Sequence, residues 1–319
     1  MQISPGTRLG PYEIISRLGA GGMGEVFKAR DTRLDRSVAI KVLSAAFADD
    51  PQFRTRFERE ARTISQLNHP HICTLHDIGD EHGTRYLVME LIEGESLADR
   101  LARGPMPLTD VLRLGAQVAD ALDRAHRAGV VHRDLKPGNI MLPKTGAKLL
   151  DFGLARPALP APSPDALTVQ QPVTAEGAIA GTLPYMAPEQ LQGNQTDSRT
   201  DIFAFGTVLY EAATGRRAFT APSAASLVAR ILEHRPPGMS EAHSVTPAPL
   251  ERLVMTCLEK DPDARYQCAG DLARDLRSMS ADPVAAEPLR AAPHLPIRWL
   301  AAGVVLAFAA AAVAALTAY

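Results

Sequence analysis

The glycine-rich segment of this chain is followed by a strand pattern. Leu18–Val26 reads LGAGGMGEV, with Gly19, Gly21 and Gly24 in a G-x-G-x-x-G-x-V frame. Glycines let backbone amides approach phosphate oxygens because no Cβ intervenes. A dinucleotide-binding fold requires a helix directly after such glycines, whereas EVFKAR alternates as a strand does. The segment therefore indicates a phosphate-binding turn between strands and argues against the dinucleotide fold.

Composition is that of an ordinary globular chain. Of its 319 residues 46% are hydrophobic, and 34 basic and 36 acidic side chains give a formal charge of −2. This balance gives no global attraction to nucleic acid, so we expect no nucleic-acid partner. Cys73, Cys257 and Cys268 lack zinc or disulfide spacing, which fits a reducing compartment. No secretion signal is recognisable at the start, so we expect the first domain in the cytosol.

Strand patterns come first along the chain and helix patterns follow. Segments rich in β-branched and aromatic residues predict strands over residues 12–18, 24–31, 37–43 and 85–91. Between them, residues 51–68 have helical spacing, with an apolar face of Phe53, Phe57, Ile64 and Leu67. Beyond residue 97 the patterns are helical. Residues 108–129 predict an amphipathic helix that begins at a Thr cap. Residues 200–215 are nearly all apolar and predict a helix buried on every side.

Two Pro- and Ala-rich stretches, 156–177 and 278–296, have no periodicity and predict an exposed loop and a linker. The second leads to WLAAGVVLAFAAAAVAALTAY at Trp299–Tyr319, a run without charge that is long enough to cross a bilayer. The alternative is a buried alanine-rich helix. Arg290 and Arg298 precede the run, and the positive-inside tendency then places the N-terminal part in the cytoplasm. Either this is a tail anchor, or the chain is shortened from a parent with an external domain.

Val38–Lys41 reads VAIK within an expected strand. A period of two puts Ala39 and Lys41 on one face, opposite Val38 and Ile40. A small residue and a cation would then share the surface under the glycine loop, which suits adenine and phosphates. A lysine held there needs an acidic partner, and Glu60 on the following helix is available.

Charged residues also gather between two apolar strand patterns. HRDLKPGN occupies His132–Asn139, and DFG follows at Asp151–Gly153 after a short hairpin pattern that would return Asp151 toward Asp134. An Asn and an Asp together supply oxygen ligands of the kind that Mg²⁺ takes alongside waters and substrate phosphates. Asn139 and Asp151 are therefore candidate metal ligands.

The motifs taken in order resemble those of a protein kinase, specifically a bacterial, membrane-anchored serine/threonine kinase of the eukaryotic-like (Hanks) type. The glycine loop, VAIK, the helix glutamate, HRDLKPGN, DFG and APE all occur in sequence, over about Tyr12–Leu276. The resemblance implies an α+β, two-lobed fold: a small antiparallel sheet with one helix, then a large, mainly helical lobe. With the apolar run added as one transmembrane helix, the expected boundaries are 12–90 and 91–277 for the lobes, 278–296 for the linker and 297–319 for the span.

The resemblance also implies residue roles, with ATP and Mg²⁺, or Mn²⁺ instead, as cofactors. Lys41 would bind the α and β phosphates and pair with Glu60, and Asp134 would be the base. Lys136 would steady the γ-phosphate, and Thr182 would bond Asp134 and Lys136. Residues implied to contact the nucleotide are Leu18, Gly19, Ala20, Gly21, Gly22, Met23, Gly24, Glu25, Val26, Ala39, Lys41, Glu90 and Ile92, with Met89 guarding the rear of the pocket.

Other positions are implied to be architectural. Glu189 would pair with Arg265, and Asp201 would anchor the backbone of the catalytic loop. Two positions depart from the pattern on the substrate-docking side: Phe203 stands where many relatives have tryptophan, and Leu183 separates Thr182 from its proline. These departures blur peptide preference and leave phosphoryl transfer unaffected.

The expected enzyme is a non-specific serine/threonine protein kinase in membrane signalling, single-pass, with its kinase domain in the cytoplasm. Its partners would be ATP, protein substrates and the lipid bilayer, and a homodimer is left open. Arg133 suggests control by autophosphorylation at Thr168 or Thr174, with Ser163 a weaker choice. A pseudokinase and a small-molecule kinase are the alternatives. The intact Lys41, Asp134, Asn139 and Asp151 argue against the first; APE and the long activation segment argue against the second.

Overall fold

The computed structural model describes residues 3–21, 24–44, 51–152, 181–242 and 246–281. The side chains of residues 51–56 and Ala242 are not among those described. The expected loop over 156–177, residues 282–296 of the expected linker and the 297–319 span lie outside these ranges, as do Gly22, Met23 and the three candidate phosphorylation sites. Residues 278–281, which were predicted to belong to the linker, instead form the last turn of a helix that ends at Ala281. Within the described ranges, no helix has the length and apolarity to cross a membrane.

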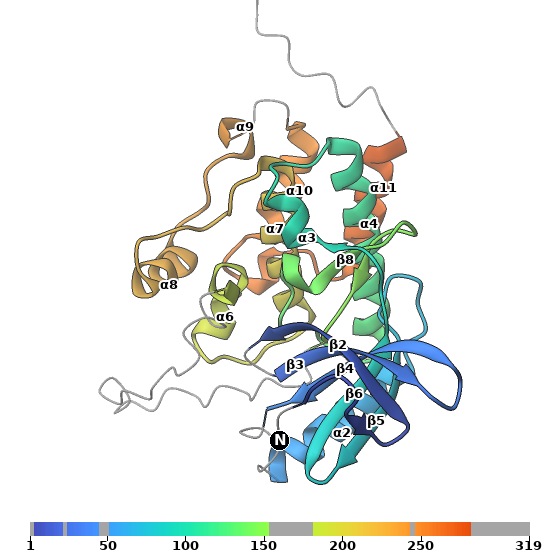
Figure 1. Cartoon of the computed structure of the whole chain (residues 1–319). Helices are drawn as coiled ribbons and strands as arrows, with labels where there is room; N and C mark the ends of the chain where they lie inside the picture. The colour runs from blue at the N-terminus through green and yellow to red at the C-terminus, as the bar shows by residue number, and fades with distance from the viewer. Residues whose placement is uncertain (1–2, 22–23, 45–50, 153–180, 243–245, 282–319) are drawn as a thin grey trace, which may run out of the picture. The chain divides into compact units, whose positions relative to one another are not determined.

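The small lobe is an antiparallel sheet in the order β1-β2-β3-β4-β6-β5. The bounds of these strands are Arg8–Leu9, Tyr12–Gly21, Gly24–Asp31, Arg36–Leu43, Leu75–Glu81 and Thr84–Glu90 for β1 to β6. Helix α2, Pro51–Ser65, follows β4. Figure 1 shows this sheet in blue and cyan, with α2 beside it. The predicted strands and the helix are present, and α2 ends three residues earlier than its pattern predicted.

The large lobe is helical apart from a small sheet, β7-β8-β9, of Glu95–Ser96, Ile140–Leu142 and Lys148–Leu149. Its helices are α3 Leu97–Leu101, α4 Leu108–Arg127, α6 Pro188–Leu191, α7 Ser198–Thr214, α8 Ala224–Glu233, α9 Met239–Ala242, α10 Ala248–Cys257 and α11 Ala269–Ala281. Short 3₁₀ turns are η1 Pro137–Asn139, η3 Leu183–Tyr185 and η4 Pro262–Ala264. Helix α4 does not begin at a Thr cap: Pro107 precedes it, without a side-chain cap. Proline suits the start of a helix, where an amide hydrogen has no intrahelical acceptor.

Helix α7 is the centre of the large lobe, as its apolar sequence predicted. Its residues from Thr200 to Tyr210 are all buried. A Cβ added to Gly206 would lie 2.7 Å from the Cβ of Cys257, so glycine is what lets α10 approach this closely. Figure 1 shows α7 among α4, α10 and α11. The same core cluster extends to Phe57, Ala61 and Ile64 of α2, so the two lobes share one apolar interior.

Candidate active site

The glycine segment forms the β2–β3 hairpin, in which Gly21 pairs with Gly24. Gly24 has φ 143°, and a Cβ there would lie 1.8 Å from the carbonyl oxygen of Val42. Only glycine fits this position, because any side chain would overlap the neighbouring strand. Gly24 therefore lets the β2–β3 hairpin pack closely against β4.

Strand β4 carries Ala39 and Lys41 on one face, as predicted. Val38 and Ile40 lie in the separate apolar cluster on the other face of the sheet. Lys41 is 9% exposed, and its Nζ lies 3.0 Å from Oδ1 of Asp151. Lys41 and Asp151 are 110 residues apart in sequence, and the fold brings a small-lobe cation against a large-lobe carboxylate.

The expected Lys41–Glu60 pair is not formed among the described residues. Oε1 of Glu60 lies instead 3.5 Å from Nη1 of Arg133. The position of Glu60 on α2 was predicted correctly, and its partner in this conformation was not. The physical reason is competition: Lys41 is already compensated by Asp151, and Glu60 is compensated by Arg133 instead.

Asp134 lies at the centre of a hydrogen-bonded group. Lys136 Nζ is 2.9 Å from Asp134 Oδ2 and donates to Thr182 Oγ1 at 2.9 Å. Asn139 Nδ2 donates to the Asp134 carbonyl at 2.8 Å and to Oδ2 at 3.1 Å. These contacts fix the Asp134 carboxylate, which is 8% exposed, and they bring together the residues that the sequence placed here.

Asp201, which is fully buried, anchors the backbone of the loop that contains His132 and Arg133. Its Oδ2 accepts from the backbone N–H of His132 at 2.7 Å, and its Oδ1 from that of Arg133 at 2.8 Å. His126 Nε2 donates to the same Oδ2 at 2.7 Å, a contact that the sequence reading missed. The anchoring holds Arg133 at φ 60°, a left-handed conformation that is costly for a residue with a side chain.

The segment before Asp151 is held by the same loop. His132 Nε2 donates to the carbonyl of Leu150 at 2.8 Å, and its ring packs on that of Phe152 at 4.8 Å. Asp151 itself has φ 51°. The loop therefore positions the second carboxylate through its neighbours on both sides.

The residues present fit a magnesium–nucleotide complex. The side-chain nitrogen of Asn139 donates to Asp134. Its side-chain oxygen, Oδ1, takes part in no hydrogen bond within the described residues. Oδ1 of Asp151 forms the ion pair with Lys41, and the Asp151 side chain is 30% exposed. An amide oxygen and a carboxylate oxygen are thus available beside a buried lysine, which is the hard-oxygen donor set that Mg²⁺ takes.

The segment that joins the lobes contains an unpredicted ion pair. Oε2 of Glu90 lies 2.7 Å from Nζ of Lys148 and accepts from the backbone N–H of Thr74 at 3.3 Å. Lys148 lies on β9, two residues after Gly146, and no motif in the sequence marked it. The side chain of Glu90 is therefore committed to structure, consistent with a role for its backbone alone toward adenine.

Glu189 and Arg265 form the predicted architectural pair. Both terminal guanidinium nitrogens of Arg265, Nη1 and Nη2, donate to Glu189, at 2.8 and 2.9 Å, and Thr200 Oγ1 donates to Glu189 at 2.8 Å. Burial alone would raise the pKa of Glu189, but these donors outweigh it and hold that pKa below its ordinary value. Phe203, the departure noted in the sequence, packs under the Arg265 guanidinium at 5.0 Å.

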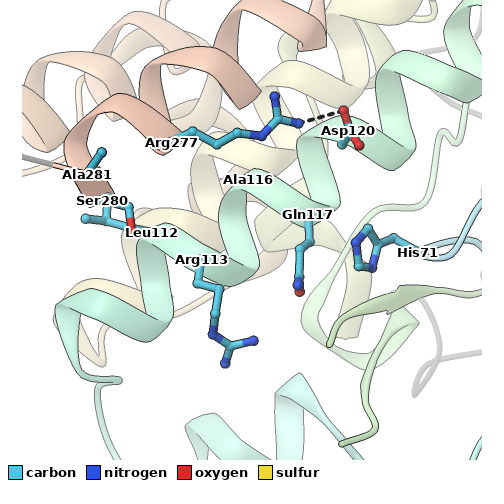
Figure 2. Close-up of a pocket in the computed structure, with 9 residues that line it drawn as sticks. All are labelled: His71, Leu112, Arg113, Ala116, Gln117, Asp120, Arg277, Ser280 and Ala281. Atoms are coloured by element: carbon cyan, nitrogen blue, oxygen red, sulfur yellow. Dashed lines mark hydrogen bonds and ion pairs between the residues drawn. The ribbon is translucent and has the colours of Figure 1, made fainter. Parts of the chain in front are cut away.

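A cavity of about 390 Å³ lies elsewhere in the large lobe, against α4 and the end of α11. Figure 2 shows its lining, in which Arg277 is joined to Asp120. None of the residues predicted for catalysis or nucleotide binding lines it. The candidate active site is therefore defined by its side-chain chemistry and not by this cavity.

Comparison with known proteins gives a consistent picture. The family described as "Protein kinase domain" matches residues 12–275. Serine/threonine-protein kinase PknB of Mycobacterium leprae (strain TN) is 40% identical over 271 residues, covering 83% of this chain and 42% of PknB. Serine/threonine-protein kinase PknA of Mycobacterium tuberculosis (strain ATCC 25177 / H37Ra) is 39% identical over 282 residues, covering 86% of this chain and 62% of PknA.

A solved structure agrees. The crystal structure of the Mycobacterium tuberculosis PknI kinase domain superposes with a TM-score of 0.68 at 28% identity, over 87% of this chain and 99% of that one. The chain thus spans less than two thirds of the curated relatives but nearly all of an isolated kinase domain. By its motifs, its fold and these matches, this chain belongs to the protein kinase family, among relatives named as bacterial serine/threonine kinases.

Proposed function

We propose that this protein is a serine/threonine protein kinase that transfers the γ-phosphate of ATP to protein hydroxyls. The observation that carries the proposal is the group of Asp134, Lys136 and Thr182, joined by contacts of 2.9 Å. Lys136 in HRDLK and Thr182 in GTLPY match the serine/threonine pattern of the family. The named relatives support the same substrate class.

In this proposal each residue has one task. Asp134 accepts the proton of the substrate hydroxyl and directs its oxygen. Lys41 binds phosphate oxygens, Lys136 stabilises charge at the transferred group, and the β2–β3 hairpin supplies backbone amides. Asn139 and Asp151 would hold Mg²⁺, which when bound neutralises charge on the phosphates. Ala39 and Leu18 would contact adenine, with the backbone of Glu90 and Ile92 at its edge.

We also propose regulation by autophosphorylation of the activation segment, at Thr168 or Thr174. Arg133 supports this, because it is a half-exposed cation next to Asp134 that now interacts with Glu60. A phosphate would attract Arg133 more strongly than a carboxylate does. Release of Glu60 would allow it to pair with Lys41 once Asp151 holds the metal.

The proposed setting is a bacterial membrane, with the kinase domain in the cytoplasm and a single span at 297–319. The uncharged run and the two arginines before it support this. Fractionation of the full chain, compared with one cut at Pro296, tests it: only the full chain should sediment with membranes. A homodimer of kinase domains is a further proposal, which sedimentation of the purified protein would test.

The activity is tested with labelled ATP, Mg²⁺ and a generic basic protein, using the purified full chain in detergent. Wild type should label serine and threonine, and Asp134→Asn should not. Nucleotide binding without transfer in the wild type would support the pseudokinase, and transfer only to a small molecule would support the other alternative.

A further inference from the structure

Two consecutive arginines follow the C-terminal end of the central helix α7. Arg216 and Arg217 are exposed, and Gly215, with φ 69°, ends the helix before them. The hydroxyl of Thr214 accepts from the Arg216 backbone N–H at 3.2 Å and donates to the Arg216 carbonyl at 3.1 Å. The turn that presents both side chains is therefore fixed by a buried threonine.

This turn is linked to the catalytic centre through contacts of the described residues. Thr182, which binds Lys136, directly precedes the η3 turn, and Tyr185 ends it. The hydroxyl of Tyr185 donates to Oε2 of Glu211 at 2.6 Å. Oε1 of Glu211 lies 3.8 Å from Nε of Arg217. Thr182, the η3 turn and Glu211 thus connect the group around Asp134 with Arg217.

The ion pairs of the described residues compensate these two arginines only in part. Glu211 is its carboxylate, but the side chain is only 15% exposed and already accepts from Tyr185. Burial, and next the charge of Glu211, raise the pKa of Tyr185, so the phenol remains a donor. Arg217 is 48% exposed, and Arg216 forms no ion pair within the described part of the chain. One compensated carboxylate therefore lies beside two arginines that face solvent.

We propose that Arg216 and Arg217 select protein substrates that carry an aspartate or glutamate close to the phosphorylated serine or threonine. The inference rests on the proposed kinase activity and names the substrate class of the same site. A guanidinium binds a carboxylate through paired N–H donors, and charges placed around a binding surface suppress partners of like charge. Glu211 also affects the preference. When Arg217 is removed, the negative charge of Glu211 is no longer compensated by it, and the variant should favour basic substrates.

The experiment uses the full chain and a set of peptides with one threonine acceptor in a neutral background. A single Glu, Gln or Lys is scanned through the positions on each side of the acceptor, and kcat/KM is measured. Wild type should prefer Glu over Lys at one or two positions by about fivefold, the size of an exposed ion pair. The preference should shrink as salt rises, because exposed charges are screened.

Three variants complete the test. Arg216→Glu with Arg217→Glu should reverse the preference, and Arg217→Ala with Glu211→Gln should weaken it, because only Arg216 then remains. Arg252→Glu, an exposed arginine on α10, controls for net charge and should leave the preference as in the wild type. Equal rates for Glu and Lys peptides in the wild type would overturn the inference, as would a preference that the Arg216/Arg217 reversal does not move. Transfer to the neutral Gln peptide reports the kinase activity separately, so failure of the proposed function is distinguishable from failure of this inference.

Discussion

Glu60 lies against Arg133, while Lys41 lies against Asp151. The two ion pairs measure 3.5 Å and 3.0 Å and stand in place of the Lys41–Glu60 pair expected from the motifs. Arg133 immediately precedes the proposed base, so the α2 helix is connected to the catalytic loop through this contact.

We expect Arg133→Gln to raise the basal activity of the unphosphorylated enzyme. The substitution removes the competitor for Glu60, and a partly exposed ion pair is worth up to about 1 kcal/mol, or about fivefold in rate. The same variant should lose stimulation by phosphorylation. Initial rates before and after phosphatase treatment give both quantities. Glu60→Gln is the matched control, and activation in that variant too would contradict the explanation.

Lys41→Met and Asp151→Asn should each lower phosphoryl transfer by about 10²-fold or more, since no nearby group supplies the same charge. The fold should survive, because Asp151 is partly exposed and can be hydrated when Lys41 is removed. Labelled-phosphate transfer measures the first effect and thermal unfolding the second. Normal transfer by either variant would show that the site is assigned wrongly.

Arg265→Ala should be strongly destabilising. It leaves Glu189, which is 7% exposed, as an uncompensated buried charge, at a cost of about 3–5 kcal/mol. Glu189→Gln should cost less, because no anion remains. Denaturant unfolding of both variants measures the difference. Since the pKa of Glu189 is lowered in the fold, the stability from this pair is present above the ordinary carboxyl pKa and is lost as pH falls through the lowered value.

The lowered pKa of Lys260 should make the free energy of unfolding increase with pH. Its Nζ is buried without a hydrogen-bond partner in the described residues, 4.3 Å from the Phe219 ring centroid. Burial, then the charge of Arg265, lowers the pKa of Lys260 from 10.5 to about 8. The unfolded chain therefore binds more protons between pH 8 and 10.5, and the Lys260 contribution increases over that window. Lys260→Met should be the more stable protein at pH 7, with the difference closing above pH 8. A difference in unfolding temperature that does not change with pH would refute this.

Local pattern was sufficient for β2, β3, β4, β6 and α2 of the small lobe, but it missed β1 and β5. A period of two placed Ala39 and Lys41 correctly, because a strand has only two faces. The buried helix α7 was predicted equally well, because its sequence has no polar face. The group around Asp134 required the family resemblance, because residues distant in sequence meet there.

The partner of Glu60 could not be predicted from the sequence. Glu60 is in the expected place on α2, but whether it meets Lys41 or Arg133 depends on how that helix sits against the large lobe. Lys148 and His126 lacked any signal, since a lysine on a strand or a histidine on a helix is usually solvent-exposed or simply packed. Both contacts depend on the positions of elements far away in the chain, Glu90 and Asp201 respectively.

Asp201 connects the loop that contains the proposed base to the buried core of the helical lobe. The amides of His132 and Arg133 bind a carboxylate on the central helix, whereas the glycine hairpin belongs to the sheet. Loosening of the central helix should therefore displace the proposed base directly, even when the substituted residue lies far from Asp134.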